Sequence, residues 1–125
     1  LTTDGAFLAA TIDEAGPAAE GMYVSAFGPR PESAVDDAWI KAYQAVEYRN
    51  PDTYSINGYS ALQVLAEGVK KAGSFDATQV AGAIRGLAEI ETPMGALSYS
   101  AEGDLKEQTI YIFQVQQGDW VQAYP

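Results

Sequence analysis

The spacing of apolar residues changes once along this chain, near Gly95, and the change limits the folds that the chain can adopt. Between residues 33 and 87 apolar side chains recur every three or four positions, which is typical of helices with one buried face. From Gly95 onward they recur every second position, as in strands. Before the helices, residues 22–27 are β-prone and apolar on both faces, which predicts a strand covered on two sides. The expected order is one strand, three helices and a terminal β-meander.

Turn and cap residues predict where these segments begin and end. Residues 6–12 are expected to form a short helix, ended by Gly16-Pro17. Near the C-terminus, strands are expected over residues 96–100, 109–116 and 120–124, with turns at Glu102-Gly103-Asp104 and Gln117-Gly118-Asp119.

The three main helices each have a predicted cap. Ser33 is expected to cap the first, and Asp76 the third. The long second helix is expected over residues 53–71, closed by Gly73. Its predicted buried stripe consists of Tyr59, Leu62, Leu65, Ala66 and Val69, and the apolar face predicted for the first helix consists of Val35, Trp39, Ala42, Tyr43 and Val46.

The fold class indicated by this order is α/β, but the sheet is incomplete. Helices of a doubly wound fold each pack on several parallel strands, and one apolar strand cannot serve three of them. We therefore interpret residues 1–125 as a single partial domain. A partial lobe exposes apolar surface where its missing strands would pack, so the isolated chain is expected to self-associate.

Charge and missing residue types exclude several functions. The chain has 17 acidic and 7 basic side chains, and no His or Cys. The few basic residues form no patch in the sequence, so we expect no nucleic-acid partner. Without His and Cys, the usual triads, zinc ribbons and disulfides lack their essential residues, and no cofactor is expected. No apolar run approaches the roughly 20 residues that cross a bilayer. Because Leu1 is not an initiator Met, a processed form or fragment is expected.

The paired carboxylates do not make a catalytic site. Asp13-Glu14 and Asp36-Asp37 are neighbours in sequence, and adjacent residues on a helix do not face one another. A solvated face and a helix cap explain them. The acidic residues between 100 and 107 lack the spacing of a calcium loop. The chain is therefore predicted not to be an enzyme.

Two residues have positions that suit a small ligand. Tyr54 lies at the start of the long helix, where an aromatic ring can form the wall of a pocket. Asp4 precedes Gly5 in a turn, where an exposed carboxylate can pair with an ammonium group. From position alone, a structural role remains open for both residues.

Four stretches, taken in order, resemble a known family. The chain is similar to the C-terminal third of the periplasmic substrate-binding proteins of branched-chain amino acid ABC transporters, the leucine/isoleucine/valine-binding type with the type I periplasmic-binding-protein fold. The stretches that carry the resemblance are Thr3-Asp4-Gly5, residues 16–25, residues 52–66, and residues 94–99 followed by Glu102-Gly103-Asp104.

The resemblance implies two α/β lobes that close on a ligand, with this chain forming part of one lobe. Residues 1–94 would be the helical part of the first lobe and residues 95–125 the terminal strands near the hinge. Asp4, with Gly5 beside it, would receive the α-ammonium group of an amino acid, and Tyr54 would line its side-chain pocket. The implied protein is exported to the periplasm or to another extracytoplasmic location, with its signal peptide outside this chain. Its implied partners are a membrane permease and the missing N-terminal part of the same protein.

Two other functions remain as alternatives. The same fold also implies a possible ligand-sensing domain that regulates a partner. The chain could instead be an autonomous α+β interaction module with no small ligand, in which case it is expected to be a compact monomer whose helices cover the terminal strands.

Overall fold

The computed structural model describes residues 1–124, which divide into two compact units. The first unit is formed by Leu1–Pro29 together with the C-terminal segment from Thr109, and the second by Arg30–Gln108. Within the part of the chain that is described, no helix is long and apolar enough to cross a membrane.

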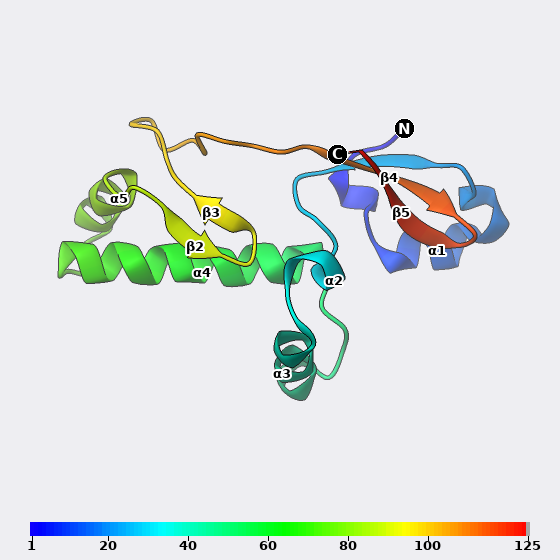
Figure 1. Ribbon diagram of the computed structural model, residues 1–125, viewed down its shortest axis with the longest axis horizontal. Coiled ribbons are helices and arrows are strands. Elements are labelled where there is room, and N and C mark those ends of the chain that lie inside the picture. Colours follow the sequence, from blue (N-terminus) through cyan, green and yellow to red (C-terminus); the bar gives the residue numbers. More distant parts are fainter. Residues whose placement is uncertain (125) are drawn as a thin grey trace. The chain divides into compact units, whose positions relative to one another are not determined.

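The first unit is a three-stranded antiparallel sheet with short helices, and its strand order is β1-β4-β5 (Figure 1). Its elements are η1 (Asp4–Ala6), α1 (Ala9–Ala15), η2 (Gly16–Ala19), β1 (Tyr23–Ala26), β4 (Tyr111–Gln116) and β5 (Asp119–Tyr124). The predicted helix over residues 6–12 thus begins three residues late, at Ala9, because residues 4–6 are taken up by a 3₁₀ turn. It ends at Gly16, as predicted, where φ is +53°.

An aromatic core holds this unit together. The Phe113 side chain is fully buried, and its ring stacks on Phe7 with 4.3 Å between centroids. The Trp120 ring meets the edge of Phe7 at 5.5 Å, and its Nε1 donates to the Leu8 carbonyl at 3.2 Å. The buried members of the cluster are Phe7, Ala19, Val24, Ala26, Phe113, Val115 and Trp120.

Burial alternates along β1, so the prediction of a strand covered on two sides is wrong. Val24 and Ala26 are buried in the aromatic core, whereas Tyr23, on the other face, is exposed. The predicted turn between the last two strands is confirmed. Gln117 and Gly118 both have positive φ, which matches the twist of a two-residue hairpin turn.

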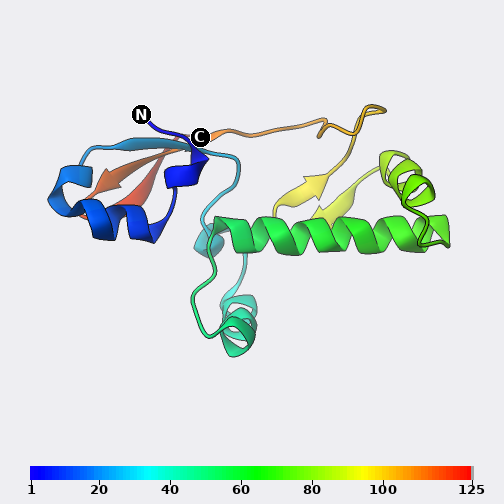
Figure 2. The ribbon, with the colours of Figure 1, turned by 180° about the vertical axis from the view of Figure 1, so that it is seen from behind.

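The second unit is built around one long helix. Its elements are α2 (Pro31–Ala34), α3 (Asp37–Glu47), α4 (Thr53–Ala72), α5 (Ala77–Arg85), β2 (Ile90–Thr92) and β3 (Gly95–Leu97). Figures 1 and 2 show α5 and the β2–β3 hairpin along α4, with α3 placed near the N-terminal end of α4. The strand expected over residues 96–100 corresponds to β3, which pairs with β2, a strand that was not predicted. The prediction of one continuous β-meander at the C-terminus is therefore wrong, because β3 belongs to a different sheet from β4 and β5.

The helix ends follow local capping chemistry, with one correction. Ser33 caps no helix, because α2 ends at Ala34 and Val35 is extended. Asp36 caps α3 instead, and its carboxylate accepts from the Trp39 N–H at 2.8 Å. The predicted cap of α5 by Asp76 and the closure of α4 by Gly73 are both confirmed.

The buried face of α4 differs from the predicted one. Tyr59, Leu62 and Leu65 are 45%, 67% and 50% exposed. The face that packs inside the unit instead carries Ile56, Ser60, Val64 and Gly68, spaced by four residues. Gly68, which has no side chain, lets α5 approach this face closely. The helix consequently keeps a second, exposed apolar face.

Gly68→Ala tests this close approach. A Cβ atom at Gly68 would lie 2.5 Å from Ile84 Cγ1 and 3.2 Å from Val80 Cγ1, both on α5. At Gly58 on the same helix it would meet nothing within 4 Å. Both changes gain about 1 kcal/mol of helix propensity. We expect Gly58→Ala to show that gain, and Gly68→Ala to be about 1–3 kcal/mol less stable than Gly58→Ala because of overpacking. Urea denaturation of the two variants measures the difference, and equal stabilities would contradict the packing described.

Candidate functional site

Asp4 and Gly5 lie in a tight turn that is anchored by the core of the first unit. The Asp4 carbonyl accepts from the Phe7 N–H at 2.8 Å, and the Thr3 carbonyl accepts from the Ala6 N–H at 3.0 Å. Phe7 is buried, so the turn is fixed to the aromatic core. Asp4 is half-buried and Gly5 is exposed, with nothing within 4 Å of the place where a Cβ would be. The backbone at Gly5 is therefore open to a close neighbour.

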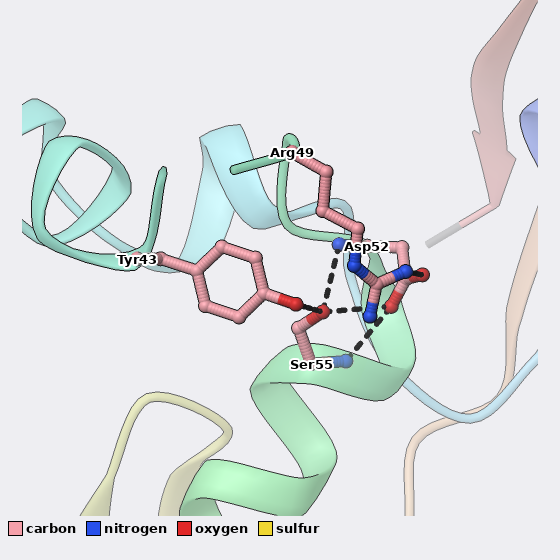
Figure 3. Close-up of polar contacts among 4 residues, drawn as sticks. All are labelled: Tyr43, Arg49, Asp52 and Ser55. Atoms are coloured by element: carbon pink, nitrogen blue, oxygen red, sulfur yellow. Dashed lines mark hydrogen bonds and ion pairs between the residues drawn. The ribbon is translucent and has the colours of Figure 1, made fainter. Parts of the chain in front are cut away.

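Tyr54 lies in the first turn of α4. This helix begins with a complete capping box formed by Asp52 and Ser55, which Figure 3 shows. The Asp52 carboxylate accepts from the Ser55 N–H at 2.8 Å, and the Ser55 hydroxyl accepts from the Asp52 N–H at 3.2 Å. Thr53 is buried, whereas Tyr54 is 41% exposed. The cap thus fixes the backbone on both sides of a tyrosine whose ring reaches the surface.

A tyrosine from α3 joins this cap. Tyr43 Oη lies 2.8 Å from Ser55 Oγ, and Arg49 Nη1 lies 3.8 Å from the second carboxylate oxygen of Asp52 (Figure 3). Sequence analysis placed Tyr43 only on the apolar face of its helix and missed this contact. The Asp52-x-x-Ser55 spacing was a readable signal for the cap, but no pattern links Tyr43 to it.

The other acidic residues have structural roles or are solvated. Asp36 caps α3, as one of the readings for the Asp36-Asp37 pair predicted, and Asp13 and Glu14 are exposed on α1. Hydrogen bonds from its own backbone N–H and from Ser100 lower the pKa of Glu102. Among residues 1–124 no group of three acidic side chains is placed to hold a metal ion.

The structure assigns the candidate residues to separate units. Asp4 and Gly5 belong to the first unit, and Tyr54 to the second. Each candidate is held by its own local scaffold, a core-anchored turn for Asp4 and a capped helix for Tyr54.

Comparison with known proteins shows which family the chain resembles. The family model described as periplasmic binding protein matches residues 3–119. A Leu/Ile/Val-binding protein homolog from Brucella suis is 35% identical over 105 residues, which are 83% of this chain and 28% of that protein. A leucine-, isoleucine-, valine-, threonine- and alanine-binding protein from Pseudomonas aeruginosa is 33% identical over 100 residues, which are 80% of this chain and 26% of that protein.

A solved structure shows the same fold. The leucine-binding protein LivK from Thermotoga maritima matches with a TM-score of 0.80 and 24% identity, over 96% of this chain and 35% of that one. The chain therefore spans about a quarter to a third of the length of the proteins that it matches. The α/β fold class and its interpretation as a partial lobe are confirmed.

Proposed function

Because the chain belongs to the periplasmic binding protein family, we propose that it is part of a longer solute-binding protein that binds apolar α-amino acids for an ABC importer. The observation that carries this proposal is the match over residues 3–119, together with relatives whose names specify leucine, isoleucine and valine. These relatives are binding proteins and not enzymes, in agreement with the sequence prediction. The longer protein is called the parent protein below.

The proposed site residues have distinct tasks. Asp4 accepts hydrogen bonds from the α-ammonium group of the ligand, and the open space at Gly5 lets the ligand approach the backbone. Tyr54 contributes the face or edge of its ring to the apolar side chain of the ligand. A charged pair and an apolar wall together discriminate amino acids from simple carboxylic acids and from polar amino acids.

The proposed location is the periplasm, and the proposed partner of the ligand-bound parent protein is a membrane permease. Ligand binding stabilises a closed form that the permease recognises, as in other two-lobed proteins that close around a ligand. The remainder of the parent protein supplies the groups for the ligand carboxylate.

Calorimetric titration of the parent protein tests the proposed function. Leucine, isoleucine and valine are expected to bind with similar affinities, and glutamate is expected to bind at least 100-fold more weakly because the pocket would bury its charge without a partner. Heat release with none of the three apolar amino acids would overturn the amino-acid assignment. Binding of glutamate alone would overturn the apolar pocket.

Tyr54→Ala tests the pocket wall. Removing the ring takes away apolar contact worth about 1–2 kcal/mol, so leucine binding by the parent protein is expected to weaken by roughly 5- to 30-fold. Tyr54→Phe keeps the ring and is expected to stay within about twofold of the unmodified protein. Tyr124→Ala is the matched control, because Tyr124 is an exposed tyrosine in β5 with no proposed ligand contact. Equal affinities of the Tyr54→Ala and Tyr124→Ala variants would remove Tyr54 from the site.

A further inference from the structure

We propose that Tyr43 is a positioning residue for the ligand site, which acts on Tyr54 through the Ser55 side chain. The inference rests on the proposed function, since it assigns a role toward the same ligand. According to this proposal, α3 stabilises the N-terminal turn of α4 through Tyr43. Three observations carry it: how α3 is attached, how the hydrogen bonds of the cap are shared, and where Tyr54 lies within the cap.

The attachment of α3 to α4 is narrow and specific. No residue of α3 is fully buried. Trp39 stacks on Tyr43 at 5.5 Å and meets Tyr59 of α4 edge-on at 5.5 Å. Beside this aromatic trio, the Tyr43 hydroxyl reaches Ser55 at 2.8 Å. Stacking on Trp39 therefore holds the Tyr43 ring in place, and the hydroxyl of the same side chain is hydrogen-bonded to the α4 cap.

Counting protons at Ser55 fixes the direction of these hydrogen bonds. Ser55 Oγ lies 2.8 Å from Tyr43 Oη, 3.0 Å from Asp52 Oδ1 and 3.2 Å from the Asp52 backbone nitrogen. At Asp52 the carboxylate oxygen accepts and the backbone N–H donates, so only the hydroxyl of Tyr43 can take either part. The single Ser55 proton must go to Asp52, so the Tyr43 hydroxyl must donate to Ser55. Every donor and acceptor at this oxygen is then used.

Tyr54 lies inside the stretch that this network fixes. It follows buried Thr53 and precedes Ser55, so both of its peptide neighbours are held. The direction of a side chain in the first helical turn follows from its backbone. Without the Tyr43 donor, one acceptor position on Ser55 loses its partner, and the Ser55 hydroxyl is no longer held from the α3 side. A looser first turn places the Tyr54 ring less accurately against a ligand.

A double-mutant cycle on the parent protein separates positioning from general stability. Tyr43→Phe removes only the hydroxyl and keeps the ring that stacks on Trp39. Leucine binding is expected to weaken by roughly 3- to 10-fold in Tyr43→Phe, but by less than about 1.5-fold when Tyr43→Phe is added to Tyr54→Ala. Tyr124→Phe is the control for loss of an exposed hydroxyl and is expected to change nothing. An equal loss in both backgrounds, or no loss at all, would overturn the inference.

Hydrogen exchange provides a readout that needs no ligand. The Ser55 amide is expected to exchange several-fold faster in Tyr43→Phe than in the unmodified parent protein, while the Gln79 amide, capped by Asp76 on α5, is expected to keep its rate. An unchanged rate at Ser55 would show that Tyr43 does not support the cap, and would overturn the inference whatever the ligand results. Faster exchange at Ser55 with unchanged leucine affinity in Tyr54→Ala would instead locate the failure in the proposed ligand site.

Discussion

Phe113→Ala is expected to lower the free energy of unfolding of the first unit by about 3–5 kcal/mol. The Phe113 side chain is fully buried in β4, and its ring contacts Phe7 at 4.3 Å and Tyr111 at 6.4 Å between centroids. Removing it leaves a cavity between the central strand and the segment that carries the Asp4 turn. Such a loss is a large share of the roughly 5–15 kcal/mol that stabilises a typical domain. Urea denaturation followed by tryptophan fluorescence measures it, because Trp120 is buried in the same core.

Phe75→Ala is the matched control for this prediction. Phe75 is 91% exposed, and the same change there is expected to stay within about 0.5 kcal/mol of the unmodified protein. A loss of less than about 1 kcal/mol for Phe113→Ala would mean that the aromatic cluster is not the core of this unit.

Asp4→Asn is expected to weaken leucine binding by the parent protein by roughly 10- to 150-fold. The change keeps the size of the side chain but removes the charge that we propose pairs with the α-ammonium group, an interaction worth about 1.5–3 kcal/mol. The turn is expected to survive, because it is held by the backbone bonds of Thr3 and Asp4 to Ala6 and Phe7. Calorimetric titration measures the affinity, and thermal unfolding without ligand checks the fold.

A change of ligand gives this prediction its sharpest control. The compound 4-methylpentanoate is leucine without its amino group, so its binding is expected to be insensitive to Asp4→Asn. Asp13→Asn removes the same charge from an exposed position on α1 and is expected to leave leucine binding unchanged. Equal weakening of leucine and 4-methylpentanoate by Asp4→Asn would argue against an ammonium contact. Leucine affinity equal to that of the unmodified protein would exclude Asp4 from the site.

Local chemistry made part of this fold predictable. The Asp76 cap, the Gly73 closure and the Gln117-Gly118 turn each depend on residues within a few positions, and all three are confirmed. The Ser33 cap was wrong because Ser33 lies within the short helix α2, and α3 begins only after Asp36, whose carboxylate caps it. Local signals were sufficient at the three confirmed positions, where the cap or turn depends only on residues that are close in sequence.

Long-range packing was not predictable in the same way. The buried face of α4 depends on its packing within the unit, and Gly68, which lets α5 approach, adds little to an apolar pattern. The pairing of β1 with β4 joins segments at opposite ends of the chain, which no local period reveals. In the candidate site, the positions of Asp4 and Tyr54 followed from turn and helix signals, but their proposed roles followed from the family resemblance. The role of Tyr43 was missed because its hydroxyl, on α3, bonds to Ser55 on a different helix, α4.

The discontinuity of the first unit constrains the order in which this chain can fold. Strand β1 is made early and β4 late, with roughly 80 residues between the partners, so their pairing closes a long loop. The contacts of α4 with α5 and of β2 with β3 are formed within the inserted segment and close only short loops. During synthesis we therefore expect the second unit to fold first, before β4 has left the ribosome and can pair with β1. For that interval the edge of β1 that pairs with β4 has no partner, whereas its other edge can already bond to Thr2. A chaperone that covers the open edge would prevent wrong pairing.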